Sequence, residues 1–91
     1  MFSLIIPVHN RAGFLPRLFR SLDAQCLQPD ETILVDNASQ DGSYEICLDY
    51  AEKRKAEGVS ITVLRQEKAG ACAARNKGLQ VARSEYVFFF D

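Results

Sequence analysis

The chain has 91 residues, of which 47% are hydrophobic and 25% are charged, and its formal net charge is −1 at pH 7. This composition indicates one globular unit and excludes a fibre or a disordered tail. Because the lysines and arginines are scattered and nearly balanced by acids, nucleic acid is not an expected partner. No apolar run approaches the roughly 20 residues that cross a bilayer, and no signal-like segment opens the chain, so we expect a cytoplasmic location, with the inner face of a membrane as an alternative for the intact protein.

The three cysteines, Cys26, Cys47 and Cys72, are far apart and form no C-x-x-C pair, and His9 is the only histidine. A disulfide framework or a zinc site is therefore poorly supported. Each cysteine falls within a predicted helix, so we expect three small, partly buried apolar side chains in a reducing compartment.

The first predicted elements are a strand, a helix and a second strand. Residues 2–8 are apolar and rich in β-branched types, which is typical of a strand covered on both faces. From Phe14 the apolar residues recur every three or four positions, which predicts an amphipathic helix to about Cys26 with Pro16 in its first turn. Residues 32–35 form a second buried strand.

A polar loop over 36–43 separates that strand from a second predicted helix. The helix begins at Tyr44 and ends at Gly58. Residues 59–64 alternate between apolar and polar types before becoming continuously apolar, which predicts a less deeply covered strand at the edge of the sheet.

The last predicted elements are a helix over 71–83 and a strand over 86–90. The small and apolar residues of the helix fall near one face, so the helix can approach a sheet closely; they are Ala71, Ala74, Gly78 and Val81. The strand is apolar on both faces and is expected at the centre of a sheet. Because the elements that would cover it are not in the sequence, we expect a homo-oligomer.

The alternation of strands and helices predicts a largely parallel, Rossmann-like α/β sheet with helices on both faces. Ligands of such sheets bind outside the carboxyl ends of the strands. In this sequence those ends carry His9 and Asn10, Asp36 and Asn37, the 65–70 loop and Asp91.

Asp36 is the best single binding candidate that the pattern offers. A carboxylate at the end of the second strand can accept a hydrogen bond from a ribose hydroxyl or a base N–H. The alternative is an aspartate that only forms a turn or caps a helix, and spacing leaves both roles open. The turn at 7–13 has neither G-x-G-x-x-G nor a Walker-type G-x-x-x-x-G-K, which argues against NAD, FAD and P-loop chemistry.

Four segments, in their order and spacing, resemble family 2 glycosyltransferases of the GT-A fold: 5–10 (IIPVHN), 33–43 (ILVDNASQDGS), 73–78 (AARNKG) and 89–91 (FFD). The resemblance implies that residues 1–91 are the N-terminal nucleotide-sugar-binding part of a larger GT-A domain, truncated where the D-x-D motif starts. It also implies transfer of a sugar, with inversion, from a nucleoside diphosphate such as UDP to a hydroxyl of a glycan or lipid-linked acceptor.

The resemblance assigns the nucleotide to Pro7, His9, Asn10, Asp36, Arg75, Asn76 and Asp91. Asp36 would accept a hydrogen bond from the base, while Arg75 and Asn76 match the family's A-R-N-x-G segment beside the same pocket. Asp91 matches the first D-x-D carboxylate, which implies a metal role with Mg²⁺ or Mn²⁺ in the intact enzyme. No catalytic base falls within the sequence, so we expect the 91-residue chain alone to be inactive.

Two departures and several alternatives accompany this assignment. His9 stands where the family more often has Tyr, and Asn37-Ala38 replaces the commoner Asp-Gly. Arg75 could be a surface residue in an ion pair, Asn76 could bond locally, and Asp91 could be only a chain end.

Two other functions compete with a glycosyltransferase. A receiver-like regulatory module of similar architecture is the first, although it needs an acidic pair where this chain has His9 and Asn10. A dinucleotide-dependent oxidoreductase is the second, and Asp36 alone favours it.

Overall fold

Strands and helices alternate along the computed structural model, which describes residues 2–25, 28–67 and 70–89. The elements are β1 (Phe2–Val8), α1 (Leu15–Asp23), β2 (Glu31–Asn37), α2 (Ser43–Lys55), β3 (Ile61–Gln66), α3 (Ala71–Val81) and β4 (Tyr86–Phe89). Their order and type confirm the sequence prediction, and Pro16 lies in the first turn of α1, where its missing N–H costs no hydrogen bond.

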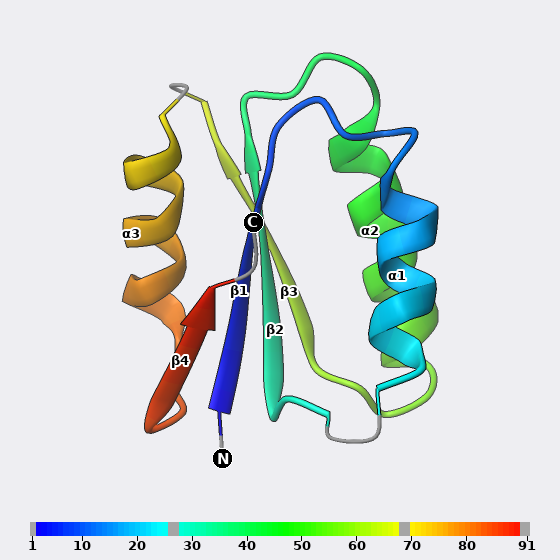
Figure 1. The fold of residues 1–91 in the computed structure, drawn as a ribbon, viewed down its shortest axis with the longest axis vertical. Helices are drawn as coiled ribbons and strands as arrows, with labels where there is room; N and C mark the ends of the chain where they lie inside the picture. The colour runs from blue at the N-terminus through cyan, green and yellow to red at the C-terminus, as the bar shows by residue number, and fades with distance from the viewer. Residues whose placement is uncertain (1, 26–27, 68–69, 90–91) are drawn as a thin grey trace.

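The strands form one parallel sheet in the order β3-β2-β1-β4. Figure 1 shows α1 and α2 on one face of this sheet and α3 on the other. The predicted Rossmann-like sheet with helices on both faces is thus confirmed. β2 is buried at every position, while β3 is only half-buried along its length and lies at the edge, as its alternating pattern predicted.

β4 does not lie where its composition predicted. Within the described sheet it pairs with β1 alone and forms an edge. Tyr86 is 60% exposed and Phe88 56% exposed. An apolar pattern on both faces indicates that other elements cover both faces of the strand, but it does not indicate which strands lie beside it. The crossover through α3 determines the neighbours of β4 and places it beyond β1.

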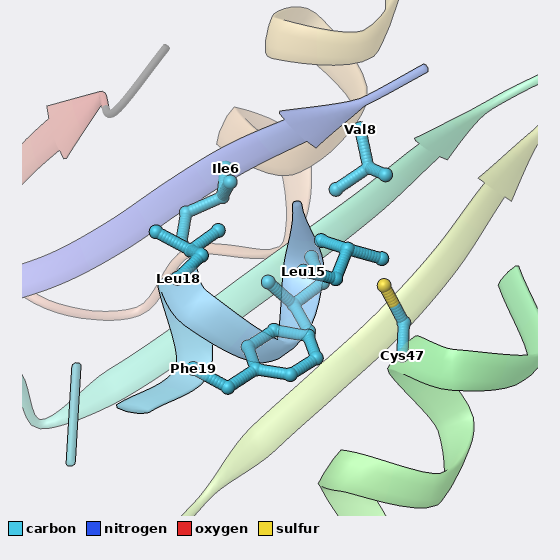
Figure 2. Close-up of a cluster of buried hydrophobic side chains, with 7 residues drawn as sticks. Ile6, Val8, Leu15, Leu18, Phe19 and Cys47 are labelled. Atoms are coloured by element: carbon cyan, nitrogen blue, oxygen red, sulfur yellow. The ribbon is translucent and has the colours of Figure 1, made fainter. Parts of the chain in front are cut away.

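The core consists of two layers, one on each face of the sheet. Toward α1 and α2, the strand residues Ile6, Val8 and Leu34 pack with helix side chains (Figure 2); these are Leu15, Leu18, Phe19 and Cys47. On the other face Ile5, Ile33 and Val35 pack with Ala74 of α3. The two layers exist because successive side chains of a strand point to opposite faces.

The close approach of α3 predicted from its small residues is present at Ala74 and Gly78. Ala74 is fully buried, and a Cβ added to Gly78 would lie 2.6 Å from Ile5 Cγ2. Val81 was expected on the same face but is 38% exposed at the last position of the helix, so the packed face is shorter than predicted. The side chain of Ala71 lies outside the described part of the structure.

The cysteine prediction is confirmed at Cys47 and wrong at Cys72. Cys47 is buried between α2 and the sheet, whereas Cys72 is exposed. Two residues of helix correspond to about 200°, so Cys72 lies on the side of α3 opposite the buried Ala74. Cys26 lies outside the described residues.

Candidate functional site

The carboxyl ends of β1 and β2 are neighbours, and the segments that follow them are bonded to each other. Val8 and Asp36 are partners in the parallel register. The Asn10 N–H donates to Ser39 Oγ over 2.9 Å, and the Gln40 N–H donates to Asn10 Oδ1 over 2.8 Å. Figure 1 shows both segments at the upper end of the sheet. Two stretches about thirty positions apart therefore form one surface.

The same surface continues to the start of α2. The Arg11 N–H donates to Ser43 Oγ over 2.9 Å, and the Ala12 N–H donates to Asp41 Oδ2 over 3.0 Å. The hydroxyl of Ser43, and then the Ala12 N–H, lower the pKa of Asp41 by hydrogen bonding its charged form. Many polar groups of this loop are thus engaged in holding its shape.

His9 projects from the end of β1 and is exposed. Its Nδ1 contacts the backbone oxygen of Asn37, and its Nε2 lies 3.4 Å from Asn10 Nδ2. Because a carbonyl only accepts, Nδ1 carries the donated hydrogen and Nε2 accepts from the Asn10 amide. The ring is therefore oriented by both strand ends and remains exposed.

Two non-glycine residues of this surface have left-handed backbone conformations. Asn10 has φ 50° and Ala38 has φ 54°. Asparagine tolerates this region, whereas the left-handed conformation of an alanine costs about 1 kcal/mol of conformational energy. Such conformations persist where the surroundings determine them and are frequent at functional sites.

Asp36 is fully buried, a position that its loop-like surroundings in the sequence did not predict. Its Oδ2 accepts from the Ser39 N–H at 3.0 Å and from Arg65 Nη1 at 2.9 Å. Its Oδ1 is buried and has no hydrogen-bond partner among the described residues. The buried charge also acts on Cys47: burial, and then the Asp36 carboxylate, raise the pKa of that thiol to about 12.

Arg65 is the site residue that the motifs missed. Besides Asp36, its guanidinium donates from Nη2 to the Ser39 carbonyl oxygen over 3.3 Å and from Nε to Glu67 over 3.1 Å. The guanidinium carbon lies 5.2 Å from the centre of the Tyr44 ring. The available signal was its position in the 65–70 loop at the carboxyl end of the third predicted strand; the structure makes Arg65 the register partner of Asp36.

The remaining predicted residues lie around this end of the sheet or outside the described residues. Pro7 borders a cavity of about 40 Å³, too small for a nucleoside. Asn37 Oδ1 accepts from the Gly70 N–H over 3.0 Å, which ties the start of α3 to the end of β2. Arg75 is half-buried and Asn76 is exposed, both in the second turn of α3.

Asp91, the predicted metal ligand, lies outside the described residues. Within 2–25, 28–67 and 70–89, no three histidine, cysteine, aspartate or glutamate side chains are grouped so that they could hold a metal ion. The described residues do not by themselves supply a metal site.

None of the helices in the described ranges is both long and apolar enough to span a bilayer.

Comparison with known proteins identifies the family. The sequence profile of glycosyl transferase family 2 matches residues 3–91. The chain is 40% identical over its whole length to an uncharacterized glycosyltransferase, EpsJ, of Bacillus subtilis (strain 168), and 38% identical over 98% of its length to a cholesterol galactosyltransferase of Borreliella burgdorferi. It covers 25% and 24% of those proteins, so it spans about a quarter of their length.

A solved structure agrees with the sequence match. The crystal structure of residues 1–349 of Staphylococcus aureus TarS in complex with UDP aligns with 99% of the chain at a TM-score of 0.79 and 28% identity. The chain covers 26% of that protein. Since the family profile extends over almost every residue and the sheet has the arrangement found in this GT-A relative, the chain belongs to glycosyl transferase family 2.

Proposed function

We propose that residues 1–91 are the donor-binding part of a glycosyltransferase. The enzyme would move a sugar from a nucleoside diphosphate, with UDP favoured, to a hydroxyl group. The observation that carries the proposal is the joined surface of the β1 and β2 ends, in a sheet that resembles UDP-bound TarS. Residues 1–91 would then be one subdomain of a larger GT-A domain. Membership of the family argues against the receiver-like module and the oxidoreductase.

The nucleoside would bind across His9 and Asn10, with Arg75 and Asn76 at the border of the site. His9 and Asn10 are exposed and are held by hydrogen bonds before any ligand arrives, which lowers the entropy lost on binding. Asp36 Oδ1 is an acceptor without a partner in the described residues, but it is buried. A base N–H reaches it only when the groups that cover it move.

The transfer itself would be a direct displacement at the sugar carbon that inverts its configuration. Sugar transfer to a glycan or lipid-linked acceptor needs a general base to deprotonate the attacking hydroxyl, and we assign that base to residues outside this chain. A divalent cation such as Mg²⁺ or Mn²⁺, when bound, would stabilise the leaving diphosphate, and Asp91 is the ligand that this chain would contribute. The chain's own task is to bind and orient the nucleotide.

Calorimetric titration of the chain with UDP, GDP, ADP and NAD tests the proposal. We expect weak binding that favours UDP, because the nucleoside surface is formed while the contacts to metal and sugar are incomplete. GDP and ADP serve as matched diphosphates that differ only in the base. Equal affinity for all four compounds, or no binding of any of them, contradicts a nucleotide-sugar donor site.

A further inference from the structure

We propose that Arg65, at the end of β3, is a positioning residue for the donor nucleotide. Its guanidinium fixes the loop after β2, and this loop holds the turn after β1 that carries His9 and Asn10. The inference rests on the proposed function, since it assigns Arg65 to the site described above. Arg65 itself needs no contact with the ligand.

The contacts of Arg65 bridge the first four residues of the loop. Nη1 lies 2.9 Å from Asp36 Oδ2, and Nη2 lies 3.3 Å from the Ser39 carbonyl oxygen. Asp36 Oδ2 also accepts the Ser39 N–H, so residues 36–39 are closed into a compact turn with the guanidinium across it. A planar guanidinium offers two parallel donors for such a bridge, whereas a lysine offers a single point charge.

Through Ser39, the turn that Arg65 fixes also holds the residues after β1. The Ser39 hydroxyl accepts the Asn10 N–H, and the neighbouring Gln40 N–H donates to Asn10 Oδ1. Both Asn10 and Ala38 have left-handed conformations, which need strong local restraints to persist. Arg65 supplies one of these restraints from a strand that carries none of the family motifs.

The competing explanation is that Arg65 only neutralises a buried carboxylate. The Asp36 side chain is fully buried and that of Arg65 is 30% exposed, so loss of the cation would leave a buried charge and could unfold the chain. Arg65→Lys separates the two roles, because a lysine retains the charge beside Asp36 but cannot bridge to Ser39. Because the charge is retained, we expect this variant to fold, so its binding can be measured.

The experiment compares Arg65→Lys with Arg54→Lys in the full chain. Arg54 is a matched control: its side chain is 18% exposed and pairs with Asp23 and Glu57 at the far end of α2. For each variant we would measure the Kd for UDP, the melting temperature, and the hydrogen-exchange protection of the Asn10, Ser39 and Gln40 amides. The exchange measurement needs no ligand.

For Arg65→Lys we expect faster exchange at Asn10, Ser39 and Gln40. If the loosened loop is in its binding conformation only about a tenth of the time, the Kd for UDP rises about tenfold. Arg54→Lys should leave the Kd and the three amides unchanged even where it lowers the melting temperature. Unchanged exchange in Arg65→Lys, or an equal change in Arg54→Lys, overturns the inference. If the unmodified chain binds no UDP, the proposed function fails, while the exchange data still decide whether Arg65 holds the loop.

Discussion

Asp36 is a completely buried carboxylate. Its position left two roles open, reading the base or only shaping the loop, and a substitution distinguishes them. One carboxylate oxygen is engaged with Ser39 and Arg65, and the other has no partner in the described residues. An asparagine can keep the Ser39 bond but loses the charge that both Arg65 and a base N–H would use.

We expect Asp36→Asn to raise the Kd for UDP by about tenfold to a hundredfold, equivalent to about 1.5 to 3 kcal/mol. Calorimetry in a full-length version of the protein measures the change, and thermal melting in parallel shows whether the variant remains folded. If the Kd is unchanged in a folded variant, Asp36 shapes its loop without reading the base.

Glu31 is a second buried carboxylate, at the opposite end of the sheet. Its Oε2 accepts from Ser3 Oγ over 2.7 Å and from the Arg83 N–H, which joins β2 to β1 and to the segment before β4. Burial alone would raise the pKa of Glu31, but the hydrogen bonds from Ser3 and Arg83 outweigh it, so the pKa lies below its ordinary value of 4.5. The charged form therefore stabilises the fold at pH 7.

Because the folded-state pKa of Glu31 is lowered, its contribution is complete above pH 4.5 and is lost as the pH falls through the folded value. We expect Glu31→Gln to cost about 1 to 3 kcal/mol at pH 7 and much less at pH 3, measured by urea unfolding at both pH values. A cost that is equal at the two pH values would show that the charge of Glu31 plays no part.

At the scale of an element, α3 packs against the sheet through Gly78. A Cβ there would lie 2.6 Å from Ile5 Cγ2, in a layer where Ile5 and Ala74 are completely buried. We expect Gly78→Ala to destabilise the fold by about 1 to 3 kcal/mol, despite the better helix propensity of alanine.

Gly13→Ala is the control, since a Cβ on Gly13 meets no heavy atom within 4 Å. It should change the free energy of unfolding by less than about 0.5 kcal/mol. Urea unfolding measures both variants. If Gly78→Ala is as stable as the unmodified chain, the helix can move away from Ile5 at little cost, and the close packing is not required.

For the whole molecule, the exposed apolar surface of β4 is the main consequence of its edge position. Tyr86, Phe88 and Phe89 are all exposed, and in the described sheet the strand is paired on one side only. Apolar patches and open strand edges both promote association. We expect the 91-residue chain to form dimers or larger species as its concentration rises.

Analytical sedimentation over a range of concentrations checks this prediction. Phe88→Lys should shift the chain toward monomer, because a charge on an edge strand opposes pairing. Leu48→Lys, at an exposed leucine of α2, is the matched control and should leave association unchanged. A folded monomer at all concentrations contradicts the expectation.

The sequence by itself determined the alternation of elements, the parallel sheet and the family. Apolar periodicity is a local property, and each of the four motifs is a short continuous segment of the chain, so neither depends on distant residues. The small residues Ala74 and Gly78 likewise predicted a close contact between the helix and the sheet.

Only the tertiary structure decided which distant residues meet. The pairing of Asp36 with Arg65, the bonds from Asn10 to Ser39 and Gln40, and the edge position of β4 all depend on which strands become neighbours. Strand order follows from crossovers and packing of the whole chain, which no local pattern encodes. For the same reason Asp36, which the sequence placed at the start of a polar loop, is a buried, ion-paired residue of β2, and Arg65 is part of the candidate site.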